Sequence, residues 1–92
     1  MVLLLRSPTF ARKAKKLLKK QPQLATNLQQ TLQLLATDPS LEQLKTHKLK
    51  GELQDSYACR LSYELRIIFK WVEADGEQAI LLQSIGSHDE VY

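Results

Sequence analysis

The spacing of hydrophobic residues changes once along this chain, and the change divides it into a helical half and a strand half. After a short apolar run at residues 2–6, which predicts a strand, a Ser-Pro pair at residues 7–8 is typical of a helix start. Apolar residues then recur at helical spacing up to residue 20. A second leucine stripe follows the Gln-Pro pair at 21–22 and ends at the Asp-Pro pair at 38–39. So short a connection predicts an antiparallel helix pair.

From residue 57 onward, apolar and polar residues alternate, which is the pattern of half-buried strands. The segment before it, with Leu41, Leu44 and His47, is predicted to be a loop. Asp75-Gly76 is a strong hairpin signal, and a two-residue turn there fixes which residues face each other. The facing pairs are then Trp71 with Ile80, Phe69 with Leu82 and, on the opposite face of the sheet, Arg66 with Ile85.

The preceding hairpin keeps its apolar pattern only if its turn is odd-numbered and centred on Tyr63, and then Arg60 faces Arg66. Like charges placed directly opposite each other destabilise a sheet by roughly 0.2–1 kcal/mol, so this pair suggests that an anion is held there. The order of elements predicts an α+β fold: a strand, two helices and three antiparallel strands in one domain over residues 1–92. We expect the helix pair to cover the sheet face that carries Phe69 and Trp71, with the chain leaving the sheet at Gly86.

Length and cysteine content limit the class of protein. A chain of 92 residues is near the lower end of what a single hydrophobic core can stabilise. The one cysteine, Cys59, excludes an intrachain disulfide and fits a reducing cytoplasm. The apolar start is too short for a signal peptide and no stretch is long enough to span a membrane, so a cytoplasmic location without a membrane partner is expected.

The charge of +3 is unevenly distributed. Residues 1–50 hold ten Lys or Arg and two acids, a net charge of +8, whereas residues 51–92 hold three basic residues and eight acids, a net charge of −5. The basic half is typical of a surface that binds a polyanion, and equally of a solvated lysine-rich helix.

Two histidines and an arginine stand beside predicted strand ends: His47, Arg66 and His88. These groups suffice to cleave RNA without a metal, because one imidazole can take the proton of a 2′-OH, the other can protonate the leaving 5′-oxygen, and arginine can hold the phosphate. The alternative is that both are solvated loop histidines. Neither histidine has further ligands at a metal-binding spacing, and no metal or cofactor is predicted.

The whole chain resembles the RelE/ParE superfamily of toxins from type II toxin–antitoxin modules, and most closely the YafQ-like RelE/StbE group of mRNA interferases. The specific segments are HKLKG, YACRLSYELRIIFK and IGSHDEVY. The resemblance implies a microbial-ribonuclease-like fold and a small ribonuclease that cuts mRNA in the ribosomal A site. It also implies a cognate antitoxin that silences a monomeric toxin within a hetero-oligomer.

The resemblance assigns roles to individual residues. His47 matches the position of a proposed base, Arg66 the arginine that binds the scissile phosphate, and His88 the proposed general acid. Arg60 and Glu64 stand where YafQ-type members have a histidine and an aspartate; Arg60 becomes an additional phosphate ligand, and Glu64 keeps a carboxylate that can orient a histidine. The expected RNA-binding residues are Lys13, Lys16, Lys48, Lys50 and Tyr92, the last as a base-stacking platform.

Two other functions remain open at the level of sequence. The related ParE toxins share the fold without the nuclease site and inhibit DNA gyrase, although the two histidines argue against this function. The chain could also be an antitoxin-binding module that has lost catalysis.

Overall fold

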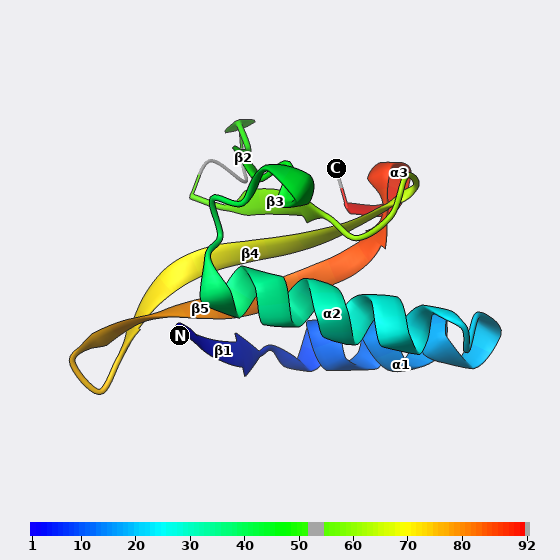
Figure 1. Cartoon of the computed structure of the whole chain (residues 1–92), viewed down its shortest axis with the longest axis horizontal. Helices are drawn as coiled ribbons and strands as arrows, with labels where there is room; N and C mark the ends of the chain where they lie inside the picture. Colours follow the sequence, from blue (N-terminus) through cyan, green and yellow to red (C-terminus); the bar gives the residue numbers. More distant parts are fainter. Residues whose placement is uncertain (52–54, 92) are drawn as a thin grey trace.

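The computed structural model describes residues 1–51 and 55–91, and it shows a mixed sheet with a helix pair on one side (Figure 1). The elements in chain order are β1 (Leu3–Arg6), α1 (Pro8–Lys20), α2 (Leu24–Thr37), the 3-10 turn η1 (Glu42–Leu44), β2 (His47–Lys48), β3 (Tyr57–Arg60), β4 (Leu65–Ala74), β5 (Glu77–Ser87) and α3 (His88–Val91). The predicted α+β fold is confirmed.

The ends of the two long helices follow from local sequence. Ser7 is the N-cap of α1, and its Oγ accepts a hydrogen bond of 3.0 Å from the backbone N of Phe10. The helix stops before the Gln-Pro pair, and α2 begins at Leu24 rather than at the proline. At its end, the backbone N of Asp38 donates to the carbonyl of Leu34. Pro39 then prevents continuation of the helix.

The sheet order is β1-β5-β4-β3-β2, with β1 parallel to β5 and the other pairs antiparallel. The prediction that His47 lies in a loop is wrong, because His47 and Lys48 form the short edge strand β2, opposite Ala58 and Tyr57. Two residues are too few to show an alternating pattern, so this strand could not be predicted from the sequence.

The β4–β5 hairpin turns at Asp75-Gly76, whose φ angles of 53° and 80° are those of a left-handed two-residue turn. The predicted pairs of Trp71 with Ile80 and Phe69 with Leu82 are confirmed. The third pair is wrong: a register shift between Ile68 and Phe69 places one extra residue on β5, and Arg66 faces Gly86. The strand also continues past Gly86 to Ser87 before α3 begins.

The main core lies between the sheet and the helix pair. Phe10, Leu35, Phe69 and Leu82 are fully buried in it, and Leu17 packs at its border. The prediction for Trp71 is wrong, since its side chain is 37% exposed and is not part of the main core. No helix in the described part of the chain is long and apolar enough to cross a membrane.

Candidate active site

The face of the sheet opposite the main core carries Arg66. In β4, Leu65, Ile67 and Phe69 point into the main core, whereas the alternating residue Ile68 belongs to a second, smaller cluster with Leu49, Ala58 and Val91. Because side chains alternate along a strand, Arg66 lies on the face of this second cluster, as predicted. Figure 1 shows α3 on the side of the sheet opposite the helix pair.

The guanidinium of Arg66 is oriented by the turn that joins β3 and β4. Its Nη1 donates to the carbonyl oxygens of Ser62, Tyr63 and Leu65, at 2.7, 3.1 and 2.9 Å. One nitrogen therefore points at the backbone of the turn. Because a guanidinium is a planar fork of five donors, fixing one nitrogen fixes the direction of the other two.

Arg60 faces Arg66 across the β3–β4 pair, as predicted from the odd-numbered turn. Its guanidinium lies 5.7 Å from the centre of the Tyr63 ring, so a cation–π contact partly offsets the repulsion between the two arginines. The two positive charges thus share one end of one sheet face.

His88 is the first residue of α3, directly after the end of β5. Its backbone N donates to the carbonyl of Glu64 at 3.3 Å, which ties the start of α3 to the same turn that holds Arg66. Val91 of α3 packs on the second cluster. Four predicted site residues therefore gather at one corner of the molecule: Arg60, Glu64, Arg66 and His88.

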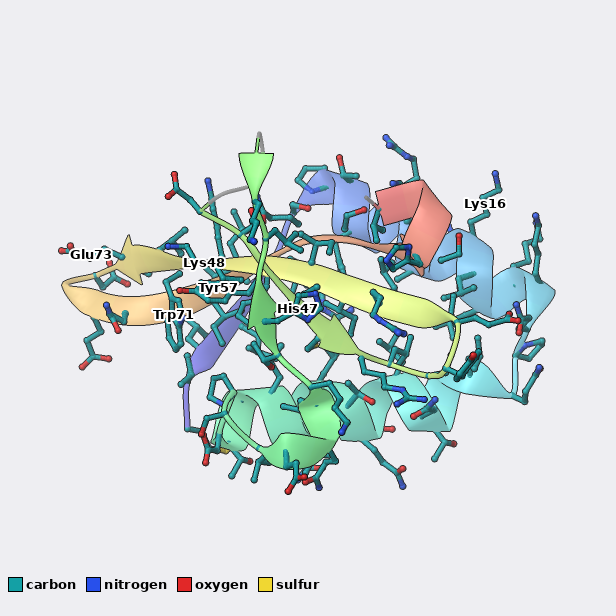
Figure 2. All side chains as sticks on the ribbon, turned by 90° about the horizontal axis from the view of Figure 1, so that it is seen from above. Lys16, His47, Lys48, Tyr57, Trp71 and Glu73 are labelled. Carbon is teal, nitrogen blue, oxygen red and sulfur yellow. The ribbon has the colours of Figure 1, made fainter. Side chains whose placement is uncertain are left out.

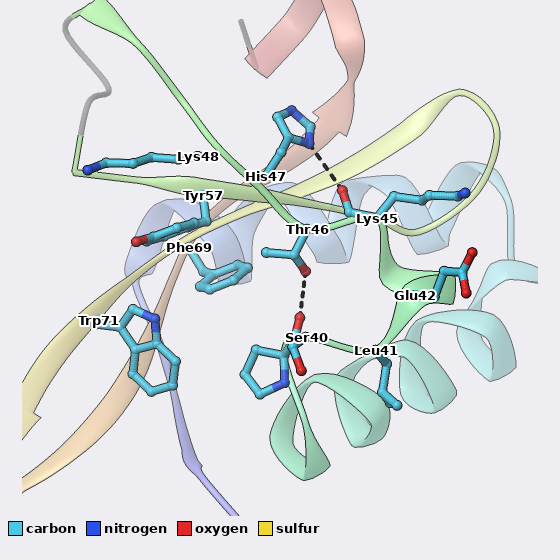
Figure 3. A pocket seen from close by; sticks show the side chains of 11 residues that line it. Ser40, Leu41, Glu42, Lys45, Thr46, His47, Lys48, Tyr57, Phe69 and Trp71 are labelled. Carbon is cyan, nitrogen blue, oxygen red and sulfur yellow. Dashed lines mark hydrogen bonds between the residues drawn. The ribbon is translucent and has the colours of Figure 1, made fainter.

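His47 lies on the same face but at the edge strand. It pairs with Ala58, which is two residues from Arg60 on β3, so their side chains point to the same side. The offset from Arg66 is two strands and two residues, which corresponds to a Cα separation of about 12 Å. Figure 3 shows the His47 ring turned away from Trp71.

The protonation of the His47 ring follows from its neighbour. Its Nδ1 lies 3.1 Å from the carbonyl oxygen of Lys45, and a carbonyl only accepts, so Nδ1 carries a proton. In the neutral ring the lone pair is then on Nε2. This is the tautomer that a general base acting through Nε2 requires.

A basic cavity lies between α1 and the end of the sheet, on the helix side, where Leu65 and Ile85 also line it. It has a volume of about 330 Å³ and is bordered by Lys13, Lys16 and Lys20 of α1 together with Glu64 and Ser87. Lys13 is anchored to β5 because its Nζ donates to Ser84 Oγ at 3.1 Å. Two of the lysines predicted to bind RNA therefore stand beside the residue that precedes His88.

The remaining predicted RNA-binding residues lie elsewhere. Lys48 borders a different cavity, on the edge of the sheet, and Lys50 is exposed after β2. Tyr92 lies outside the described residues. Within residues 1–51 and 55–91, no group of three or more His, Cys, Asp or Glu side chains could hold a metal.

Cys59 is buried in the main core. Burial raises the pKa of its thiol to about 12, and the positive charge of Arg66 only partly opposes this. The thiol is therefore protonated and unreactive at neutral pH, as expected for a small core residue.

Sequence reasoning missed a large aromatic cavity beside β2. Its volume is about 570 Å³, and the residues that line it are Pro39, Ser40, Leu41, Glu42, Lys45, Thr46, His47, Lys48, Tyr57, Phe69 and Trp71 (Figure 3). The rings of Tyr57 and Phe69 stack with their centres 5.7 Å apart. In the sequence, only the position of Trp71 near the end of an alternating strand indicated this cavity. The loop that completes the cavity has no regular pattern from which its position could be predicted.

Comparison with solved structures gives the same fold. A metal-bound toxin from Helicobacter pylori is 29% identical with a TM-score of 0.80, and each chain is covered completely. YafQ from Escherichia coli is 17% identical with a TM-score of 0.78, over 100% of this chain and 99% of that one. YafQ in the E. coli DinJ-YafQ toxin-antitoxin complex is 19% identical with a TM-score of 0.76, over 99% and 97% of the two chains.

A search of the curated proteins found no match. Residues 4–92, almost the whole chain, match the family model described as "Bacterial toxin of type II toxin-antitoxin system, YafQ". The resemblance inferred from the sequence is confirmed, and this chain belongs to the YafQ family of bacterial type II toxins.

Proposed function

We propose that this protein is a ribosome-dependent endoribonuclease that cleaves mRNA by attack of the 2′-OH and is silenced by a cognate antitoxin. The observation that carries the proposal is the meeting of Arg66 and His88 at the β3–β4 turn, where Arg66 bonds the carbonyls of Ser62 and Tyr63 and His88 bonds that of Glu64. The group that we propose to bind phosphate and the group that we propose to act as acid are thus bonded to the same turn.

In the proposed reaction, Nε2 of His47 takes the proton of the 2′-OH. The 2′-oxygen then forms a bond to the adjacent phosphorus while the bond from phosphorus to the 5′-oxygen breaks. His88 gives a proton to that 5′-oxygen, so the products are a 2′,3′-cyclic phosphate and a 5′-hydroxyl. Arg66, with Arg60 beside it, stabilises the negative charge that grows on the phosphoryl oxygens.

The separation of His47 from the other groups is compatible with this chemistry. Base and acid act on opposite sides of the phosphorus in an in-line displacement, so they must stand on either side of the phosphate. A Cα separation of about 12 Å between His47 and Arg66 leaves room for a nucleotide between their side chains. The RNA would lie across the face that carries His47, Arg60 and Arg66.

Lysines of α1 would hold the RNA or ribosomal backbone at the end of the sheet where β5 leads into His88. Lys13, Lys16 and Lys20 border the cavity beside Ser87. Figure 2 shows Lys16 at the far end of the molecule from Trp71. Contacts of lysine to phosphate release counterions and give an affinity that falls with salt, independent of sequence.

An antitoxin partner is supported by two structures of YafQ with DinJ that align with this chain. One of them is a toxin-antitoxin complex. This chain carries a net charge of +8 in its first half, which suits an acidic partner.

The test is cleavage of ribosome-bound mRNA by the wild type and by His88→Ala. Acid–base groups contribute roughly 10²–10⁴-fold in rate, so the variant should lose cleavage by that factor. The side chain of His88 is exposed and the bond from its backbone N to the Glu64 carbonyl survives the substitution, so the variant should still fold. Equal cutting by the variant would refute the assignment.

Two further measurements complete the test. Adding EDTA under conditions that keep ribosomes intact should leave the wild-type rate unchanged, and a loss would contradict a metal-free mechanism. A gyrase supercoiling assay should show no inhibition; inhibition without mRNA cleavage would favour the ParE-like alternative.

A further inference from the structure

The side chain of Gln83 makes a hydrogen bond that crosses the sheet. Its Oε1 accepts a bond of 2.7 Å from Ser56 Oγ. Gln83 belongs to β5 and Ser56 directly precedes β3, and β4 lies between these two strands (Figure 1). Two strand spacings are roughly 9.6 Å, which a glutamine and a serine side chain can span with one hydrogen bond. The bond therefore joins two strands that are not neighbours in the sheet.

This bond lies on the face of the sheet that carries Arg66. Tyr57 packs against the main core, so the side chain before it, that of Ser56, points to the opposite face by alternation. Arg66 and the second cluster lie on that same face. The side chain of Ser56 is only 4% exposed. A buried hydroxyl needs a partner, and Gln83 provides it.

Ser56 holds the end of the strand that carries His47. Its carbonyl oxygen accepts a hydrogen bond of 2.9 Å from the backbone N of Leu49, the residue directly after β2. In the described part of the chain, this bond extends a pairing of β2 with β3 that is only two residues long. The start of β2 is held separately, because Thr46 Oγ1 donates to the carbonyl of Pro39 at 2.8 Å. With so short a pairing, a shift of Ser56 would move β2 and the side chain that it carries.

The backbone of Gln83 belongs to the strand that leads into His88. Gln83 is the extra residue at the register shift of β5, and its carbonyl accepts a hydrogen bond of 3.1 Å from Ser7 Oγ. The backbone N of Ser7 also donates to the carbonyl of Leu82 at 3.0 Å. β5 then runs to its end, and His88 follows directly. The Gln83 side chain thus connects the strand of the proposed acid with the strand of the proposed base.

We propose that Gln83 is a positioning residue, whose amide acts through Ser56 to fix the place of His47 relative to β5. In the sheet order, β2 and β5 are three strand spacings apart, about 14 Å, which no single backbone bond can span. Base and acid act on the same phosphate, so their positions have to be kept within about 0.5 Å. This inference rests on the proposed function and adds a residue that does not itself touch the RNA.

The alternative is that the bond only satisfies the buried hydroxyl of Ser56. Both explanations predict a lower stability when the bond is lost, because a buried hydroxyl without a partner is costly. The two explanations differ in catalysis. A purely structural bond leaves the kcat of the folded protein unchanged, whereas a displaced base lowers kcat and leaves RNA binding, and with it KM, nearly unchanged.

Two variants of Gln83 differ in whether they can accept the bond. Gln83→Met has a similar length but no acceptor oxygen, whereas Gln83→Glu keeps both the length and the oxygen. Gln78→Met is the matched control, because it makes the same change at an exposed position of the same strand. The measurement is the rate of cleavage against the concentration of ribosome-bound mRNA, which gives kcat and KM separately. Thermal unfolding of the same samples verifies that each variant is folded.

We expect kcat to fall about 10–10²-fold in Gln83→Met, since a misplacement of about 1 Å can cost about 10²-fold. Gln83→Glu and Gln78→Met should keep the kcat of the wild type. The negative charge of glutamate can weaken RNA binding, which would raise KM without lowering kcat. A wild-type kcat in Gln83→Met, or an equal fall in Gln83→Glu, would overturn the positioning role.

Ser56→Ala tests whether Gln83 acts through Ser56. This variant should lower kcat as Gln83→Met does, and the double variant should be no slower than the slower of the two single variants. Effects that multiply would show that the two residues act independently and would refute the proposal. Ser56→Ala removes the buried hydroxyl itself, so it should fold even if Gln83→Met does not.

Amide hydrogen exchange by NMR tests the bond independently of the proposed reaction. The amide of Leu49, which is bonded to Ser56, should exchange roughly tenfold faster in Gln83→Met than in the wild type. The amide of Asp38, bonded to Leu34 at the end of α2, should keep its rate. An unchanged rate at Leu49 would overturn the inference alone, whereas a wild type that cleaves no mRNA would refute the proposed function.

Discussion

Replacing Arg66 with glutamine should separate the role that the structure shows, holding the β3–β4 turn, from the role that we propose, stabilising charge on phosphate. The turn bonds join Nη1 to three carbonyls, of Ser62, Tyr63 and Leu65. Arg66 is half-buried and the Tyr63 end of the turn is exposed, so water can replace much of what is lost. We therefore expect a loss of about 1 kcal/mol in the free energy of unfolding, the typical net value of one hydrogen bond.

The effect on catalysis should be much larger. Removing a preorganised donor that meets charge in the transition state lowers kcat by about 10²–10³-fold. Loss of stability cannot produce this decrease: a domain with at least about 5 kcal/mol of stability stays more than about 99% folded after losing 1 kcal/mol. For a chain of this size, 1 kcal/mol corresponds to a decrease of about 4–8 °C in Tm.

The measurements are single-turnover cleavage of ribosome-bound mRNA and thermal unfolding of the same samples. Arg60→Gln is the matched control, because it removes the other charge of the facing pair, whose guanidinium lies over Tyr63. Its rate should fall less than that of Arg66→Gln. An unchanged rate in Arg66→Gln, together with a lowered Tm, would show that Arg66 only supports the turn.

Three further predictions concern the basic helix, the core and a helix cap. Neutralising the lysines of α1 should weaken ribosome association whatever the mRNA sequence and should reduce the dependence of the affinity on salt. The residues to replace are Lys13, Lys16, Lys19 and Lys20. An unchanged salt dependence would show that these lysines are only solvated. Burial raises the pKa of the Cys59 thiol from about 9 in the unfolded chain to about 12 in the folded protein. The stabilisation that the neutral thiol provides is therefore complete below pH 9 and is lost as the pH rises towards 12. Urea unfolding at pH 8 and pH 10.5 should therefore show a larger alkaline loss for the wild type than for Cys59→Ala. Ser7→Ala should cost about 1–2 kcal/mol in urea unfolding, because it removes both the cap bond from Phe10 N and the bond that Ser7 Oγ donates to the Gln83 carbonyl. Thr9→Ala, at a position without a capping bond, should cost less.

Where the sequence predicted the fold correctly, the determinants were local. Ser7 and Pro8 begin a helix through a cap bond within three residues, and Asp75-Gly76 form a turn through their own φ angles. Alternation along β3 and β4 then placed Cys59 in the core and Arg60 opposite Arg66. Each of these features depends on neighbours that can be read along the chain.

The errors arose where the determinants are not local. His47 belongs to a strand only because Ala58 provides its partner, eleven positions further on. Trp71 follows the apolar phase of β4, yet it stays outside the main core, because coverage by the helices depends on packing that alternation does not encode. For the site, the sequence supplied the residue types, but not the turn carbonyls that orient Arg66 or the aromatic cavity, which segments 39–48 and 57–71 form together.

The register shift on β5 shows how one residue can serve both the core and the candidate site. Leu82 and Ile85 are three positions apart, yet both are buried in the main core. Regular alternation would put them on opposite faces, so the extra residue, Gln83, is what allows both to point inward. The same shift replaces Ile85 with Gly86 opposite Arg66. A residue without a side chain then faces Arg66 across the β4–β5 pair, which leaves space on the face that the proposed reaction assigns to the phosphate. His88 follows two positions later, and its backbone N bonds the turn that holds Arg66.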